Sequence, residues 1–218
     1  MRRITTIALA LLSGTTTLAA QGHDQDPDKA VAGGGTLPAG WEVRTDHGRG
    51  ENDIRFTATA EGYHLVLGPR VILYHPADTR SGDYRVSATF AEEPGSGHAE
   101  AFGLFIGGHD LQADDQGYTY FLIRGDGKFL VKKRHGSKTS AVTDGWTAHE
   151  AIAKLKRGGG RTTNRMAVEV SGGELRMMVN GQTIYTAPAG GLDPDGIVGI
   201  RANHNIDMLI DDYNITGG

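Results

Sequence analysis

Apolar and polar residues alternate on both sides of the turn Gly125-Asp126-Gly127, over residues 118–124 and 128–135. Successive side chains of a strand point to opposite faces, and an Asp-Gly pair between alternating segments favours a β-hairpin. One face of this predicted hairpin carries Phe121, Ile123, Phe129 and Val131, and the opposite face carries Tyr118, Tyr120, Leu122, Arg124, Leu130, Lys132 and Arg134. Aromatic and cationic side chains on an outward face suit a polar ligand or another molecule's surface.

Similar alternation predicts strands along the rest of the chain. They are expected over residues 54–60, 63–67, 71–74, 83–91, 101–107, 164–170, 175–179, 182–186, 197–202 and 208–215. The strand at 71–74 is expected to stop at Pro76, and the apolar run at 101–107 indicates a central strand buried on both faces. One short helix is predicted over residues 149–155. The chain is therefore predicted to be all-β, a two-sheet antiparallel jelly-roll sandwich with at most one short helix.

The first 40 residues differ from the rest in composition. Arg2 and Arg3 precede an apolar run at 4–12, and a stretch of small residues ends at Ala19-Ala20. This order is typical of a secretory signal peptide, and the apolar run is too short to span a bilayer. We expect residues 1–20 to be a signal peptide, 21–40 a flexible leader and 41–218 the folded domain. The protein is therefore predicted to be exported to the periplasm or the extracellular space.

Composition excludes several classes of function. The chain has no cysteine, so disulfides, thiolate metal sites and a cysteine nucleophile are excluded. Its formal net charge is −4, which disfavours non-specific binding to nucleic acid or to anionic membranes. No apolar run after the signal peptide is long enough for a membrane helix. We therefore predict no nucleic-acid partner and no membrane insertion.

Three pieces near the C-terminus follow a fixed order. A strand ends in Val179-Asn180-Gly181, a Gly-x-Val-Gly-Ile strand follows at 196–200, and the last strand contains Asp212-Tyr213. This order resembles the closing half of concanavalin A-like jelly rolls, the laminin-G-like and lectin/glucanase sandwiches. Residues 102–108 and 118–134 are similar to exported bacterial proteins of unknown function, some of which belong to the 3-keto-disaccharide hydrolase domain family. The resemblance implies a concanavalin A-like domain and, through those relatives, an activity on glycosides.

Alternation places a second group of polar residues beside the hairpin. If Ile200 and Ala202 face the core, Arg201 and Asn203 face outward, and His204 follows at the strand end. Jelly-roll order would bring this strand into the hairpin's sheet. The predicted ligand-binding surface consists of Tyr120, Arg124, Lys132, Arg134, Arg201, Asn203 and His204. Tyrosine rings suit sugar stacking, arginine and asparagine can bond hydroxyl groups, and cations attract carboxylates or sulfates.

The alternative for this surface is a solvated sheet face on which neighbouring acids balance Arg124 and Arg134. No catalytic residue is predicted. Laminarinase-type members of the fold carry Glu-x-Asp-x-x-Glu along one strand, a spacing that brings together the two carboxylates of a retaining mechanism, and this chain lacks it. The pairs Glu92-Glu93 and Asp211-Asp212 are interpreted as solvated or structural acids.

Histidines and acidic loops supply the candidate ligands for metals. The histidines show no zinc spacing; His149 and His204 are candidates for a base or ligand, or for a simple hydrogen-bonded role. Asp193 and Asp195 are candidate calcium ligands, because calcium prefers oxygen atoms of flexible loops, although Asp-Pro-Asp-Gly also suits a turn. Asp114-Asp115 is a similar acidic loop. No cofactor other than calcium is predicted.

These observations favour a carbohydrate- or polar-ligand-binding module without evident catalysis. One alternative is a glycoside-active hydrolase or lyase of the 3-keto-disaccharide hydrolase type, which the resemblance implies. A second alternative is a structural module that packs against another protein of the cell envelope.

Overall fold

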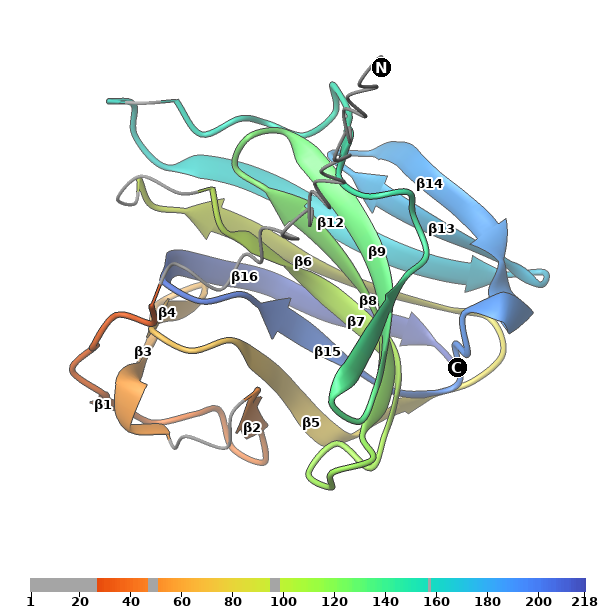
Figure 1. The fold of residues 1–218 in the computed structure, drawn as a ribbon, viewed down its shortest axis with the longest axis horizontal. Helices are drawn as coiled ribbons and strands as arrows, with labels where there is room; N and C mark the ends of the chain where they lie inside the picture. The colour runs from red at the N-terminus through yellow and green to blue at the C-terminus, as the bar shows by residue number, and fades with distance from the viewer. Residues whose placement is uncertain (1–26, 47–50, 95–98, 157) are drawn as a thin grey trace, which may run out of the picture.

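A computed structural model describes residues 27–46, 51–94, 99–156 and 158–218. The predicted signal peptide and residues 21–26 of the predicted leader lie outside these ranges. The described chain forms two β-sheets packed face to face (Figure 1). This arrangement confirms the all-β, two-sheet sandwich expected from the alternation of apolar and polar residues.

Sheet A and sheet B are both built almost entirely from antiparallel neighbours. In order across the sheet, sheet A contains β1 (Gly34–Gly35), β3 (Ile54–Ala58), β4 (Gly62–Leu67), β16 (Ile206–Gly217), β6 (Tyr84–Glu92), β12 (Thr162–Ser171), β13 (Glu174–Val179) and β14 (Gln182–Pro188). Sheet B contains β10 (Lys138–Ala141), β9 (Lys128–His135), β8 (Gly117–Arg124), β7 (Ala101–His109), β15 (Gly196–Ala202), β5 (Val71–Arg80) and β2 (Glu42–Thr45), with β11 (Thr147–Ala148) paired to β9. The short β1 is the exception, because it pairs with β3 in parallel.

The core lies between the sheets and contains the apolar half of each alternating strand. Phe90 of β6 and Phe102 of β7 meet across it, with ring centres 5.3 Å apart. The four hairpin residues predicted to face inward are all part of this core: Phe121, Ile123, Phe129 and Val131. Every residue from 101 to 108 is buried, as expected for a central strand covered on both faces.

Two local predictions about strands and helices are wrong. Strand β5 does not stop at Pro76 but continues to Arg80. Its pairing with β15 shifts register between Ile197 and Gly199, so Pro76 lies at a bulge, where the missing N–H of proline is tolerated. The described chain contains no α-helix, only the short 3-10 turns η1 (Glu51–Asp53) and η2 (Ala189–Gly191).

The segment predicted to be a helix, residues 149–155, is instead bonded to β12 and to the turn between β8 and β9. Asn164 of β12 accepts a hydrogen bond from the Ala153 N–H at 2.8 Å and donates one to the Ala153 carbonyl at 3.1 Å. The Leu155 N–H donates to the carbonyl of Gly125 at 2.8 Å. These partners take the backbone groups that a helix would bond internally.

The described part of the predicted flexible leader is attached to the domain. Strand β1 pairs with β3, and the Lys29 N–H donates to Asn205 Oδ1 at 2.8 Å. Asp28 Oδ1 lies 3.1 Å from His204 Nδ1. The folded domain therefore begins before Trp41.

No helix among the described residues is long and apolar enough to cross a membrane.

Candidate functional site

The face of sheet B that points away from the core carries a second apolar cluster, which we call the aromatic face. It consists of Ile72, Tyr74, Ala101, Phe105, Leu111, Tyr118, Tyr120 and Leu122. Its rings form a row: Tyr74 and Phe105 lie 6.4 Å apart between centres, Phe105 and Tyr118 5.2 Å, and Tyr118 and Tyr120 5.7 Å. The outward side of sheet B therefore departs from the polar outward side expected of a strand that meets water.

The outward side of sheet A shows that ordinary polar pattern. Glu169 of β12 pairs with Arg85 of β6 at 3.1 Å and with Arg176 of β13 at 3.0 Å. His64 Nε2 lies 2.6 Å from the Asp207 carboxylate on the neighbouring pair of strands. The outward face of sheet A thus carries ion pairs, while an aromatic cluster covers the outward face of sheet B.

Strand register explains how the aromatic face forms. Tyr120 pairs with Phe105 of β7 on one side and with Lys132 of β9 on the other. Phe105 is also opposite Gly199 of β15. A Cβ atom at Gly199 would lie 2.6 Å from the Phe105 ring, so the missing side chain leaves room for the ring to cover β15.

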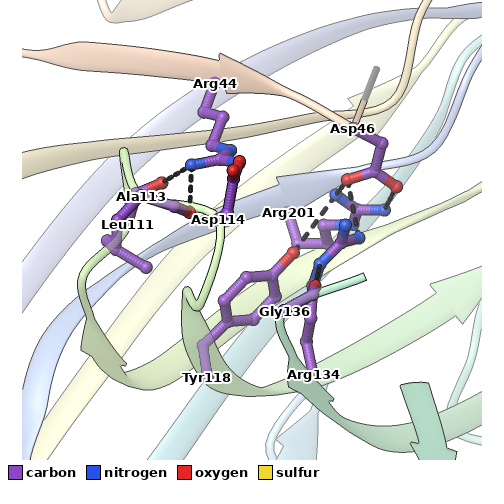
Figure 2. A network of polar contacts seen from close by, with 9 residues as sticks. All are labelled: Arg44, Asp46, Leu111, Ala113, Asp114, Tyr118, Arg134, Gly136 and Arg201. Carbon is purple, nitrogen blue, oxygen red and sulfur yellow. Dashed lines mark hydrogen bonds and ion pairs between the residues drawn. The ribbon is translucent and has the colours of Figure 1, made fainter. Parts of the chain in front are cut away.

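Asp46 forms the centre of a polar network over this face (Figure 2). Arg201 holds both Asp46 oxygens, at 2.8 Å from Nη1 and 2.7 Å from Nη2, and Arg134 Nη1 donates to Oδ1 at 2.9 Å. Arg201 is only 4% exposed and also lies 3.4 Å from the Tyr118 hydroxyl. Burial would raise the pKa of Asp46, but the charges of Arg201 and Arg134 outweigh it and lower that pKa to about 2. Two guanidinium groups thus share one ionised carboxylate.

Hydrogen bonds also fix the position of the β7–β8 loop at one end of the aromatic face. Arg44 donates to the carbonyls of Leu111 at 3.0 Å and Ala113 at 2.6 Å, as Figure 2 shows. Gln112 Nε2 donates to the Tyr74 hydroxyl at 2.9 Å, and that hydroxyl donates to Glu42 at 2.7 Å. These bonds hold Leu111 against the cluster.

Trp146 and Arg124 form the border at the other end. Trp146 packs against the aromatic face, and the Arg124 guanidinium lies 4.4 Å from the centre of its ring. Arg124 also donates to both carboxylate oxygens of Asp126, at 2.9 and 2.5 Å. Trp146, Arg124 and Lys132 are half-buried, whereas the rings between the two ends are buried.

Five of the seven residues predicted to bind a ligand lie on this outward side of sheet B: Tyr120, Arg124, Lys132, Arg134 and Arg201. Acidic neighbours form ion pairs with Arg124 and Arg134. Such pairing was expected under the alternative of a solvated sheet face on which acids balance these two arginines. Lys132 differs from the arginines, because its side chain has no ion-pair or hydrogen-bond partner in the described ranges. Ligand binding by these residues stays a prediction.

Asn203 and His204 lie beyond the end of β15. The Asn203 N–H donates to the Ala101 carbonyl at 2.8 Å. His204 is buried, with Nδ1 3.1 Å from Asp28 and Nε2 3.2 Å from Glu100. His204 therefore anchors the N-terminal segment in a second cluster, and the structure does not join it to the Asp46 network.

The predicted calcium ligands and His149 have other partners or none. Asp193 forms an ion pair with Lys133, and the Ala151 N–H donates to His149 Nδ1 at 3.1 Å. Within the residues that the structure places, no group of three or more histidine, aspartate or glutamate side chains could hold a metal ion. Calcium binding at Asp193 and Asp195 stays a prediction.

Two acidic residues were not identified from the sequence as parts of a site. Asp46 follows β2, and only the pairing of β2 with β5 brings it to the arginines. Glu92 continues the inward-facing series of β6 and is 6% exposed, so of the two roles considered for it, solvated or structural, the solvated role does not apply. Burial, with a smaller effect of Glu100, raises the pKa of Glu92 to about 7. The alternation of inward- and outward-facing residues along β6 was the sequence signal that could have predicted the burial of Glu92.

No protein-family model matches the chain, and no curated protein matches it. Solved structures do resemble it. The carbohydrate-binding module CBM66 from Bacillus subtilis has a TM-score of 0.59 at 10% identity, covering 82% of this chain and 96% of its own. A Bacillus subtilis protein of unknown function with a galectin-like fold has a TM-score of 0.56 at 13% identity, covering 80% and 88%. The carbohydrate recognition domain of Emp47p has a TM-score of 0.51 at 11% identity, covering 88% and 94%.

At these identities the likeness concerns the fold. It confirms the predicted lectin-like, concanavalin A-like sandwich. Membership of the 3-keto-disaccharide hydrolase domain family stays a prediction, because no family model matches.

Proposed function

We propose that the protein is an exported module that binds a carbohydrate on the aromatic face of sheet B. The observation that carries this proposal is the difference between the two outward faces of the sandwich. Sheet A turns ion-paired side chains outward, while sheet B carries a buried row of aromatic rings, with polar groups above it and the half-buried Trp146 and Lys132 at its border. Aromatic rings with a few placed polar groups are the usual composition of a small-molecule site.

The parts of the aromatic face would have different roles. The buried row of rings gives a rigid floor, and the Asp46 network fixes the strands around it. Trp146 and Lys132 at the border remain half-buried and offer a ring for stacking and an ammonium donor. A sugar would therefore meet the border residues first.

The similar structures support the same proposal. CBM66 is described as a carbohydrate-binding module, and the matching part of Emp47p as a carbohydrate recognition domain. A shared fold alone does not show that this chain binds carbohydrate, because proteins with one fold can have many functions. The argument therefore depends on the aromatic face itself.

A glycan array probed with the mature protein tests the proposal, followed by calorimetric titration of the strongest hit. Replacing Trp146 with alanine should weaken binding about tenfold, equivalent to about 1.4 kcal/mol, because stacking on the ring is lost. The Leu209→Ala variant is the control, since Leu209 is half-buried in β16 between the outward-facing Asp207 and Asp211. Absence of any hit, or a loss with Leu209→Ala and not with Trp146→Ala, would refute the proposal.

A second candidate function, hydrolysis or elimination at a glycoside, is favoured by Glu92. Burial, with a smaller effect of Glu100, raises the pKa of Glu92 to about 7, so this carboxyl would hold a proton near neutral pH, as a general acid must. Incubation with the array hits should then release reducing ends, and Glu92→Gln should abolish that release. Unchanged oligosaccharides after prolonged incubation would exclude this candidate and leave the binding module.

A further inference from the structure

We infer that the carbohydrate bound on the aromatic face carries a negative charge, as a uronate carboxylate or a sulfate ester, and that Lys132 pairs with it. This inference rests on the proposed function and names the class of ligand. It is carried by the arrangement of charges on the outward side of β9.

Lys132 and Arg134 lie on the same side of β9. They pair with Tyr120 and Tyr118 of β8, both part of the aromatic face. On the other side they pair with Ala141 and Thr139 of β10. Neither β10 residue carries a carboxylate, so the neighbouring strands supply no acid that faces Lys132 directly.

The charges in this region do not balance. Arg134 and Arg201 share the single carboxylate of Asp46, and Lys132 adds a cation without a partner among the placed residues. This local excess of positive charge occurs in a chain whose formal net charge is −4. A carboxylate or sulfate on the ligand would balance this positive charge. Hydrogen bonds between charged groups are stronger than those between neutral groups, so such a ligand would be favoured.

Three other cations of sheet B do not share this property. Arg124 and Lys128 both pair with Asp126, and Lys133 pairs with Asp193. Among the described outward-facing cations of β8 and β9, Lys132 is therefore the one without an acidic partner. A ligand that stacks on Trp146 would lie on the same outward side of sheet B as Lys132.

The test uses an array of uronate-containing, sulfated and uncharged oligosaccharides. The strongest hit is titrated beside its carboxyl-reduced or desulfated form, which separates the two sources of charge. We expect the charged form to bind about tenfold more tightly at low salt, and the difference to shrink at 0.5 M NaCl, where screening is strong (Debye length roughly 4 Å). Lys132→Gln should remove most of this difference, because it weakens binding of the charged form far more than binding of the uncharged form.

Lys138→Gln is the matched control. Lys138 lies on the adjacent β10, and its side chain has no ion-pair or hydrogen-bond partner in the described part of the chain. In the strand register it is opposite His135, whose side chain points to the other face of the sheet from Arg134. The same loss of charge there should leave the preference intact. An uncharged strongest hit, or equal effects of the two lysine variants, would overturn the inference while the proposed function stands. Failure of every oligosaccharide to bind would instead refute the proposed function and the inference together.

Discussion

Asp46 is a single carboxylate that compensates two arginine side chains, one of them almost fully buried. Replacing it with asparagine keeps the shape of the side chain but leaves Arg201 as a buried charge without its counterion. Such a loss is expected to lower the free energy of unfolding by about 3 kcal/mol. Urea denaturation of the Asp46→Asn variant measures the change.

The Asp126→Asn variant is the comparison for Asp46. It removes the partner of Arg124, but this pair is more exposed to solvent, at 18% and 32% of the two side chains. The expected loss is therefore below about 1 kcal/mol. Equal losses in the two variants would mean that the Asp46 network adds no more to stability than a surface pair.

Glu92 predicts a pH dependence of stability. Its pKa in the folded protein is about 7, above the ordinary value of 4.5. The folded state therefore holds the proton more tightly than the unfolded state, and this contribution is complete below pH 4.5 and is lost as the pH rises through 7. The loss is at most about 3 kcal/mol.

Glu92→Gln isolates that contribution, because the amide cannot ionise. The difference in free energy of unfolding between the variant and the parent protein should grow in favour of the variant from pH 5 to pH 8, roughly the window set by the two pKa values. Parallel pH profiles for the two proteins would show that Glu92 ionises as freely in the fold as in the unfolded chain.

At the scale of elements, the turn between β13 and β14 depends on backbone conformation. Asn180 and Gly181 have φ angles of 50° and 82°, as a two-residue hairpin turn requires. Gly181→Val should lower the free energy of unfolding by about 1 kcal/mol or more, because a β-branched residue resists positive φ. Gly190→Val, at a glycine with open space around it and no positive φ, should have a smaller effect in the same urea titration.

The faces of the β8–β9 hairpin could be predicted from the sequence, because the alternation that sets them involves only neighbouring residues in the chain. A period of two places Tyr120, Lys132 and Arg134 on one side whatever the neighbouring strands are. The partner of Arg201 could not be found this way, since Asp46 lies 155 residues earlier in the chain and meets it only through sheet pairing. The helix expected over residues 149–155 is absent because Asn164, on the following strand β12, bonds the backbone of Ala153, and the local pattern does not show this contact.

At the scale of the molecule, the sandwich has two outward sides with different chemistry. One is a solvated, ion-paired sheet, and the other is an aromatic row bordered by Trp146, Arg124 and Lys132. The chain's two tryptophans lie apart in this arrangement. Trp146 borders the aromatic face, while Trp41 packs against the core and meets Tyr213 edge-on, with ring centres 5.0 Å apart.

This separation gives a direct test of the claim that the aromatic face binds a carbohydrate. Tryptophan emission is followed during titration with the strongest array hit, in Trp41→Phe, which keeps Trp146 as the reporter, and in Trp146→Phe, which keeps Trp41. We expect a saturable change of emission in Trp41→Phe and none in Trp146→Phe. A change in Trp146→Phe alone, or binding to Trp41→Phe that leaves Trp146 emission constant, would contradict a site on the aromatic face.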